Sequence, residues 1–175
     1  MSKMLYFWNE FIRIMKKRNL IFGLLIAIGF AVSCEEDDVC VGEGTPFLTV
    51  VMRNNIGTEN LADTLTIEAS PTADFANPDT LYLKAFTDSI KLPLGGLDES
   101  QMFYRLRRRS NIERDILTVN YNTQSEYVSK ACGFRITYED LSYQSTYNHI
   151  QSIEPGETNV LTDETITNLY IRLSN

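Results

Sequence analysis

The sequence has a single histidine and no recognisable catalytic motif. His149 is the only histidine in 175 residues, and it lies in a polar stretch. The chain contains no Gly-x-Ser-x-Gly elbow to position a nucleophilic serine and no Asp-x-Asp-x-Asp-Gly calcium loop. We therefore expect a protein that is not an enzyme, with no catalytic residues, no metal site and no cofactor, and we interpret His149 as a surface or interface residue.

Paired carboxylates are the remaining candidates for catalysis. Adjacent acids occur at 98–99, 139–140 and 163–164. A glycosidase needs two carboxyl groups several ångströms apart across its substrate. Neighbouring residues on a strand point to opposite faces, so we interpret these pairs as loop charges, with glycan chemistry as the alternative.

The chain also lacks an apolar run long enough to span a bilayer. Leu20 to Val32 is a run of 13 uncharged residues, whereas a membrane helix needs about 20. The basic block Lys16-Lys17-Arg18 precedes the run and four acids follow it closely. A buried core helix has no place for such flanks, and this order is typical of a secretory signal.

The end of the apolar run carries a more specific signal. Ala31-Val32-Ser33-Cys34 resembles the lipobox of bacterial lipoproteins, with Ala31 where leucine is usual. The resemblance implies cleavage before Cys34 and a diacylglyceryl thioether on its sulfur, so the chain would meet the membrane through lipid on Cys34. An ordinary cleaved signal is the alternative.

An acidic block follows the cysteine. Residues 35–38 are Glu-Glu-Asp-Asp, and they resemble the short acidic export tag of surface lipoproteins of the Bacteroidota. A solvated spacer beside an anionic membrane is an equally good interpretation. We expect an outer-membrane lipoprotein that faces either the periplasm or the cell surface.

These signals divide the chain into three parts. Residues 1–33 are the predicted signal peptide, with Met15 as a possible true start; 34–44 are an acidic tether; and 45–175 are a β domain. Loss of 1–33 removes five basic side chains and one acidic side chain, which leaves 11 basic and 22 acidic residues and a net charge of −11. Such a charge argues against nucleic acid as a partner.

From residue 46 onward the dominant pattern is alternation of apolar and polar residues. Eight or nine short strands are predicted, separated by turn residues, and no stretch after Cys34 has a helical period beyond one turn. Pro93 within the stretch 90–94 predicts an edge strand. The fold class is therefore all-β, an antiparallel β-sandwich, immunoglobulin-like or similar. The predicted strands are 47–52, 64–69, 81–86, 90–94, 102–107, 116–121, 134–139, 143–150 and 168–173.

Several short motifs together resemble one family. A lipobox cysteine followed by acids and a second cysteine, Thr45-Pro46 before the first strand, Leu92-Pro93-Leu94, and Ala131 to Phe134 are similar to a family of small Bacteroidota lipoproteins of unknown function. The resemblance spans Cys34 to about Leu173. It implies an envelope location and a single domain, and it supplies no activity.

Two cysteines remain once Cys34 is assigned to lipid. Cys40 and Cys132 form an even pair in an oxidising compartment, which suggests a disulfide. Two free or buried thiols are an alternative, and a chemical role is the least favoured because no histidine motif accompanies either thiol.

Within the predicted β domain, positive charge is concentrated on the predicted strand 102–107 and just after it. Arg105, Arg107, Arg108 and Arg109 lie there, with Arg114 nearby. They are candidates for contact with an anionic ligand or partner, and a solvated hairpin paired with neighbouring acids is the alternative.

A tyrosine-rich stretch is a further candidate surface. Tyr138, Tyr143 and Tyr147 could contact a glycan or a protein, although tyrosine is also a good strand former. The leading hypothesis is a lipid-anchored, non-enzymatic binding or adaptor module with an envelope protein or glycan as partner. The alternative is a glycan-binding or glycan-active surface lipoprotein.

Overall fold

In a computed structural model, the structure describes Cys40 and residues 44–56, 59–109 and 113–174. The chain divides into two units at Val39 and Cys40, and the described residues belong to the second. The predicted signal peptide, the Met15 start, the lipid site Cys34 and the acidic block lie outside the described residues. Within the described part, no helix is long and apolar enough to cross a membrane.

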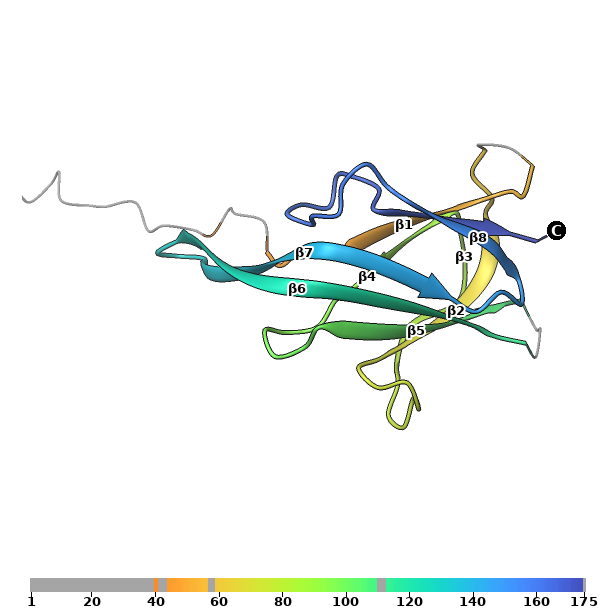
Figure 1. The fold of residues 1–175 in the computed structure, drawn as a ribbon, viewed down its shortest axis with the longest axis horizontal. Coiled ribbons are helices and arrows are strands. Elements are labelled where there is room, and N and C mark those ends of the chain that lie inside the picture. The colour runs from red at the N-terminus through yellow and green to blue at the C-terminus, as the bar shows by residue number, and fades with distance from the viewer. Residues whose placement is uncertain (1–39, 41–43, 57–58, 110–112, 175) are drawn as a thin grey trace, which may run out of the picture. The chain divides into compact units, whose positions relative to one another are not determined.

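The described residues form nine strands in two sheets, so the predicted all-β sandwich is confirmed (Figure 1). The four-stranded sheet has the order β4-β1-β9-β8, and the five-stranded sheet has the order β3-β2-β5-β6-β7. The strands are β1 (Leu48–Arg53), β2 (Asp63–Ser70), β3 (Asp79–Thr87), β4 (Ser89–Leu92), β5 (Gln101–Arg108), β6 (Asp115–Ser129), β7 (Gly133–Ser145), β8 (Ile150–Pro155) and β9 (Leu169–Leu173).

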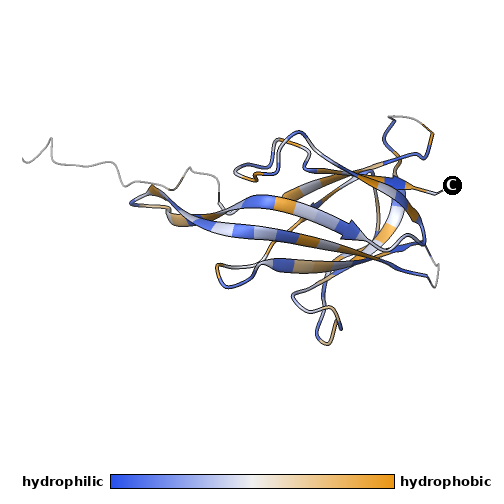
Figure 2. Ribbon diagram, in the orientation of Figure 1, coloured by the Kyte–Doolittle hydropathy of each residue, from blue (hydrophilic) through white to orange (hydrophobic). Residues whose placement is uncertain are grey.

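Alternation along the strands produces the core. Apolar and polar residues take turns along most strands (Figure 2), and one face of each sheet therefore buries its side chains against the other sheet. The fully buried side chains come from both sheets, and the largest are Tyr104, Tyr138, Leu48, Met52, Leu65, Ile67, Ile90, Leu92, Leu117, Leu161, Leu169 and Ile171.

Strand β1 explains why its sequence is apolar on both faces. It lies between β4 and β9, and Val50 and Val51 are both buried. Its pairing with β9 is parallel, with Val50 opposite Leu169, which corrects the expectation of purely antiparallel sheets. Alternation indicates which face of a strand is exposed to solvent. It does not indicate whether a neighbouring strand 119 positions away along the chain runs parallel or antiparallel.

The predicted strand at 143–150 is wrong. Tyr143 belongs to the end of β7 and Ile150 begins β8, with a turn between them. The buried carboxylate of Asp115 accepts the backbone N–H groups of Asn148 at 2.7 Å and His149 at 2.8 Å. This contact between residues far apart in sequence fixes the turn.

Two features of the strand edges matter for the surface. β4 lies at a sheet edge and ends at Leu92, directly before Pro93, as the proline predicts. β6 and β7 are longer than expected, at 15 and 13 residues. They continue to pair with each other well past Gln101, the first residue of β5. The outer half of this hairpin projects from the sandwich (Figure 1).

Candidate functional site

The structure separates the arginine cluster into members with different surroundings. Arg108 lies at the end of β5 on the core side, where its Nε donates to Asp63 Oδ2 at 2.6 Å and its Nη1 donates to the carbonyl of Ser174. The side chain of Asp63 is only 3% exposed. Arg108 is therefore a structural residue that neutralises a buried carboxylate.

Arg105 is also held in place by its neighbours. It faces away from the core, opposite Glu68 on β2, and its Nε lies 2.6 Å from Glu68 Oε2. The ring of Phe75, from the loop between β2 and β3, lies under the guanidinium, 4.6 Å from Cζ to the ring centroid. The Arg105 guanidinium therefore already contacts a carboxylate and an aromatic face, and little of its surface is left to bind a ligand.

Arg107 and Arg109 remain as the solvent-facing members. Arg107 is directly opposite Thr66 on the outer face of the sheet, and among the described residues it takes part in no ion pair. Arg109 is 76% exposed and reaches Asp63 Oδ1 at 3.2 Å. The side chain of Arg114 lies in an exposed position just before β6.

The edge strand β3 adds apolar side chains beside these cations. Leu83 and Phe86 are 71% and 75% exposed. The ladder between β2 and β3 shifts register between Leu65 and Ile67, and Lys84 in this irregular stretch has a positive φ of 51°. Alternation predicts that Leu83 shares one face of the strand with Leu81 and Ala85. Because of the irregularity, its side chain faces solvent instead.

Cross-strand register places the two kinds of side chain on one surface. Phe86 is opposite Thr64, and Arg107 is opposite Thr66. Both threonines lie on the outer face of β2, because the alternate residues Leu65 and Ile67 are core residues. We call Phe86 and Arg107, together with their neighbours Leu83 and Lys84 on β3 and Arg109 directly after β5, the basic edge surface. It combines positive charge with the exposed apolar side chains of Leu83 and Phe86.

The tyrosines do not form a common outer face. Tyr138 is fully buried, and Tyr147 is 60% exposed. Burial, with smaller contributions from Tyr121 and Glu99, raises the pKa of Tyr138 to about 12. The Tyr143 hydroxyl is buried without a hydrogen-bond partner in the described part of the chain, and burial raises its pKa strongly. Tyr138 and Tyr143 therefore serve the core rather than a ligand, and Tyr147 is the solvent-exposed member.

Three tyrosine hydroxyls from the five-stranded sheet hold the loop that follows β4. Tyr104 donates to the Pro93 carbonyl at 2.5 Å and Tyr138 donates to the Gly95 carbonyl at 3.1 Å. The Tyr121 hydroxyl accepts the Gly95 N–H at 2.8 Å. The sequence offers a signal for this loop in its Pro and Gly-Gly, but it does not show which side chains bind it.

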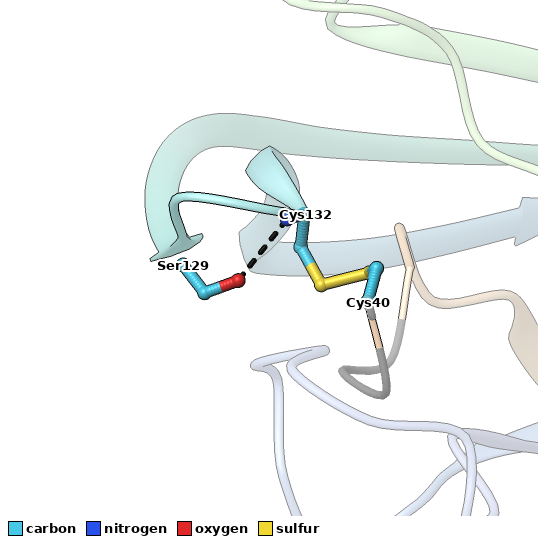
Figure 3. The surroundings of a disulfide bond; sticks show 3 residues. All are labelled: Cys40, Ser129 and Cys132. Carbon is cyan, nitrogen blue, oxygen red and sulfur yellow. Dashed lines mark hydrogen bonds between the residues drawn. A yellow bond between two sulfur atoms is a disulfide. The ribbon is translucent and has the colours of Figure 1, made fainter. Parts of the chain in front are cut away.

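The structure joins Cys40 and Cys132 in the disulfide that the sequence suggests (Figure 3). Their Cα atoms are 4.8 Å apart across a sequence separation of 92, within the range that a disulfide allows. The N–H of Cys132 donates to Ser129 Oγ at 3.1 Å, which closes the turn of the β6–β7 hairpin. The bond therefore fixes the residue at the start of the described domain to the tip of this hairpin.

The other candidates from the sequence have local structural contacts. His149 Nε2 lies 3.7 Å from a Glu113 carboxylate oxygen. Within the described ranges, no group of three or more potential ligand side chains could hold a metal ion. Glu99 accepts the Gly96 N–H and Asp163 accepts the Thr165 N–H, so these acids order turns.

Exposed aromatic residues were the surface feature that sequence reasoning missed. Tyr127 and Phe134 are 57% and 71% exposed at the end of the β6–β7 hairpin, and their ring centroids lie 5.3 Å apart. Alternation alone predicts that Phe134 faces the core together with Ile136 and Tyr138. Only the length of the hairpin reveals that the core ends before it.

Comparison with known protein families identifies a match over the second part of the chain. A family model described as "Family of unknown function (DUF6452)" matches residues 76–173, which is more than half of the chain and extends from the end of the β2–β3 loop to β9. No curated protein and no solved structure matches the chain.

Proposed function

The chain belongs to the DUF6452 family of unknown function, and we propose that it is a lipid-anchored bacterial envelope protein that binds a partner rather than catalysing a reaction. In this proposal Cys34 carries the lipid, the protein resides in the outer membrane, and the β-sandwich is a binding or adaptor module. The lipobox and acidic block favour an origin in the Bacteroidota and leave both the periplasm and the cell surface open.

The disulfide is the observation that carries the export part of the proposal. Cys40 and Cys132 are joined, and disulfides persist in oxidising compartments outside the cytosol. This agrees with the order of basic block, apolar run and Ala31-Val32-Ser33-Cys34. A signal that ends in a lipobox and a domain that holds a disulfide support the same route out of the cell.

Cys34→Ser tests the anchor. Cells that express the wild type should incorporate an alkyne fatty acid into the protein, whereas the variant should take up none and should accumulate as a soluble or unprocessed form. Cys132→Ser provides a control, because it changes a cysteine that we assign to the disulfide and should retain the label. Equal labelling of wild type and Cys34→Ser would contradict lipid attachment at this residue.

The basic edge surface supports the binding part of the proposal. The chain without residues 1–33 has a net charge of −11, yet Lys84 and Arg107 take part in no ion pair among the described residues. Phe86 lies on the same outer face and is 75% exposed. Lys84 is exposed and Arg107 is half-buried, and such cations on a surface with an exposed aromatic ring fit an anionic protein surface or sugar acid that also offers apolar atoms.

Affinity capture of the membrane-anchored protein tests this surface. Lys84→Ser with Arg107→Ser should weaken capture of the partner and reduce the dependence of capture on salt, because two charge-assisted contacts are lost. Lys91→Ser with Arg114→Ser is the matched control, since it removes one lysine and one arginine that lie outside the basic edge surface and outside the β6–β7 hairpin. Equal loss in the two double variants would show a general charge effect and no specific surface.

A glycan ligand is the second candidate, and Tyr127 and Phe134 favour it. Exposed aromatic rings commonly bind sugar faces, but these two rings are inclined by 67°, so they present no common flat platform. Binding of the purified protein to immobilised glycans, with loss in Phe134→Ser and retention in Lys84→Ser with Arg107→Ser, would favour the glycan function over the basic edge surface.

A further inference from the structure

The outer half of the β6–β7 hairpin extends beyond the other strands of the five-stranded sheet. From Asn122 to Ser129, β6 pairs with β7 alone. On the other side of β7, the last described contacts are the bridge from Tyr138 to Leu161 and the bond from the Ile136 N–H to Thr45 Oγ1. The part of the hairpin beyond these contacts consists of residues 126–134, which we call the hairpin tip.

The tip exposes aromatic area that the core does not use. Phe134, Ile136 and Tyr138 lie on one face of β7, and Phe134 is 71% exposed whereas Tyr138 is fully buried. Tyr127 is directly opposite Phe134 in the ladder, so both rings project from the same face. The other face of the hairpin carries the ion pair between Glu126, in the tip, and Arg135, directly after it, at 2.8 Å.

The disulfide limits how far the tip can lie from the lipid. Cys40 is six positions after Cys34, and a fully extended chain spans at most about 3.5 Å per residue. Cys40 therefore lies within roughly 21 Å of the lipidated residue, and Cys132 in the tip, whose Cα is 4.8 Å from that of Cys40, lies within roughly 26 Å. Without the bridge, the first residue with a described bond to β7 would be Thr45, 11 positions from Cys34, and the limit on its distance from Cys34 would be about 39 Å.

We infer that the hairpin tip is a membrane-contact surface, in which Tyr127 and Phe134 enter the headgroup region of the bilayer that holds the lipid of Cys34. This inference rests on the proposed lipid anchor. Tyrosine is enriched at membrane interfaces because its ring is apolar and its hydroxyl is polar, and Phe134 beside it adds apolar area. Two exposed rings bind a bilayer weakly alone, but a lipid within tether reach supplies the second signal that stable attachment needs.

The contact would fix the orientation of the domain. A lipid on a free tether leaves the sandwich able to rotate in any direction, whereas a lipid and a hairpin tip together define an axis. The basic edge surface is on β3 and β5, away from the outer half of β6 and β7. It would then remain available to a partner while the tip rests on the membrane.

Single tryptophans provide the test, because the only tryptophan of the sequence, Trp8, lies within the predicted signal peptide. Phe134→Trp and Phe86→Trp, which replace phenylalanines of similar exposure, are purified as full lipoproteins from membranes and reconstituted in phosphatidylethanolamine and phosphatidylglycerol vesicles that contain brominated phosphatidylcholine. We expect bromine to quench the tryptophan at 134, with a blue shift of its emission, and to leave the tryptophan at 86 unaffected.

The mass of the amino-terminal peptide separates the possible failures. A peptide without acyl chains would overturn the lipid anchor and, with it, this inference. An acylated protein whose tryptophan at 134 is quenched no more than the one at 86 would overturn the membrane contact alone and would leave the rings to a protein or glycan. Cys40→Ser with Cys132→Ser, made in the Phe134→Trp background, should lose quenching; retained quenching would overturn the role of the disulfide in holding the tip.

Discussion

The pair formed by Asp63 and Arg108 shows how one buried charge is stabilised. Burial alone would raise the pKa of Asp63, but hydrogen bonds from Arg108 and from the Thr64 N–H, with the nearby charge of Arg108, lower it below its ordinary value of 3.8. A carboxylate whose folded pKa lies below its unfolded pKa stabilises the fold above the unfolded value. This contribution is lost as the pH falls through the folded pKa.

Asp63→Asn should lower the free energy of unfolding by about 3–5 kcal/mol at neutral pH, because it leaves the Arg108 charge partly buried without its partner. Urea unfolding at pH 7 and at a series of values below 4 measures the effect. The difference from wild type should shrink in the acid series as Asp63 itself becomes protonated. Asp79→Asn, at an exposed position, is the control and should change stability by less than about 0.5 kcal/mol. A difference that is constant with pH would contradict the assignment.

Two tyrosines of the core predict opposite results for the same substitution. The Tyr104 hydroxyl is bonded to the Pro93 carbonyl, whereas the Tyr143 hydroxyl has no partner among the described residues. Tyr104→Phe should cost about 1–3 kcal/mol because a buried carbonyl loses its donor. Tyr143→Phe removes only an unsatisfied polar atom and should be neutral or stabilising. Thermal unfolding of the two variants in parallel provides the comparison, and equal destabilisation would mean that the Tyr143 hydroxyl has a bonded partner.

At the scale of the elements, the loop after β4 depends on a close approach to the five-stranded sheet. A Cβ on Gly95 would lie 2.6 Å from the Tyr121 hydroxyl oxygen and 2.8 Å from Glu99 Cβ, whereas a Cβ on Gly96 would meet nothing within 4 Å. The Glu99 carboxylate can swing aside, but the Tyr121 hydroxyl is fixed by its bond to the Gly95 N–H.

Gly95→Ala should therefore lower stability by about 1–3 kcal/mol through this overlap, and Gly96→Ala should have little effect. The two variants share the change in unfolded-chain entropy that any Gly-to-Ala substitution brings, so their difference isolates the steric term. Chemical denaturation of both proteins measures it. A Gly95→Ala protein as stable as Gly96→Ala would mean that the loop can move away from Tyr121 at little cost.

Most strands were predictable from alternation. The residues at which they begin and end, and the strands with which they pair, were not. Leu65, Ile67 and Ala69 alternate with polar residues and form β2 as expected. Leu83 has the same alternation and is exposed, because a register shift in β3 is set by pairing with β2 rather than by the local sequence. Strand β8 was missed because Asp115, a residue from another strand, determines where its turn lies.

The candidate site illustrates the same limit. Sequence identifies the arginines as unusual, but only the fold shows that Arg108 meets Asp63, 45 positions away, and that Arg105 meets Glu68, 37 positions away. Charge composition gives the number of cations and not their partners. Arg107 and Arg109 can be recognised as candidates for a binding surface only after the ion pairs of Arg105 and Arg108 are known.

At the scale of the whole molecule, the sandwich brings together segments that are far apart in the sequence. β1 pairs with β9, the last strand, and among the described residues the two strands of the hairpin tip form ladder pairs only with each other. Cys40 lies before the first strand, so its bond to Cys132 is the link between the start of the described domain and the far end of β6 and β7. The chain-entropy model assigns such a bond a stabilising effect because it constrains the unfolded chain.

Reduction should therefore destabilise the entire domain rather than loosen only the tip. A loop of 92 residues corresponds to about 4–5 kcal/mol in the chain-entropy model, which is comparable to the total stability of many small domains. The melting temperature should fall by roughly 10 °C or more on reduction. Cys40→Ser with Cys132→Ser should melt at the temperature of the reduced wild type and should not respond to reductant. If the reduced protein keeps its melting temperature while amide exchange increases only in residues 126–134, the bond would act on the tip alone, because a local opening leaves the cooperative core of the two sheets intact.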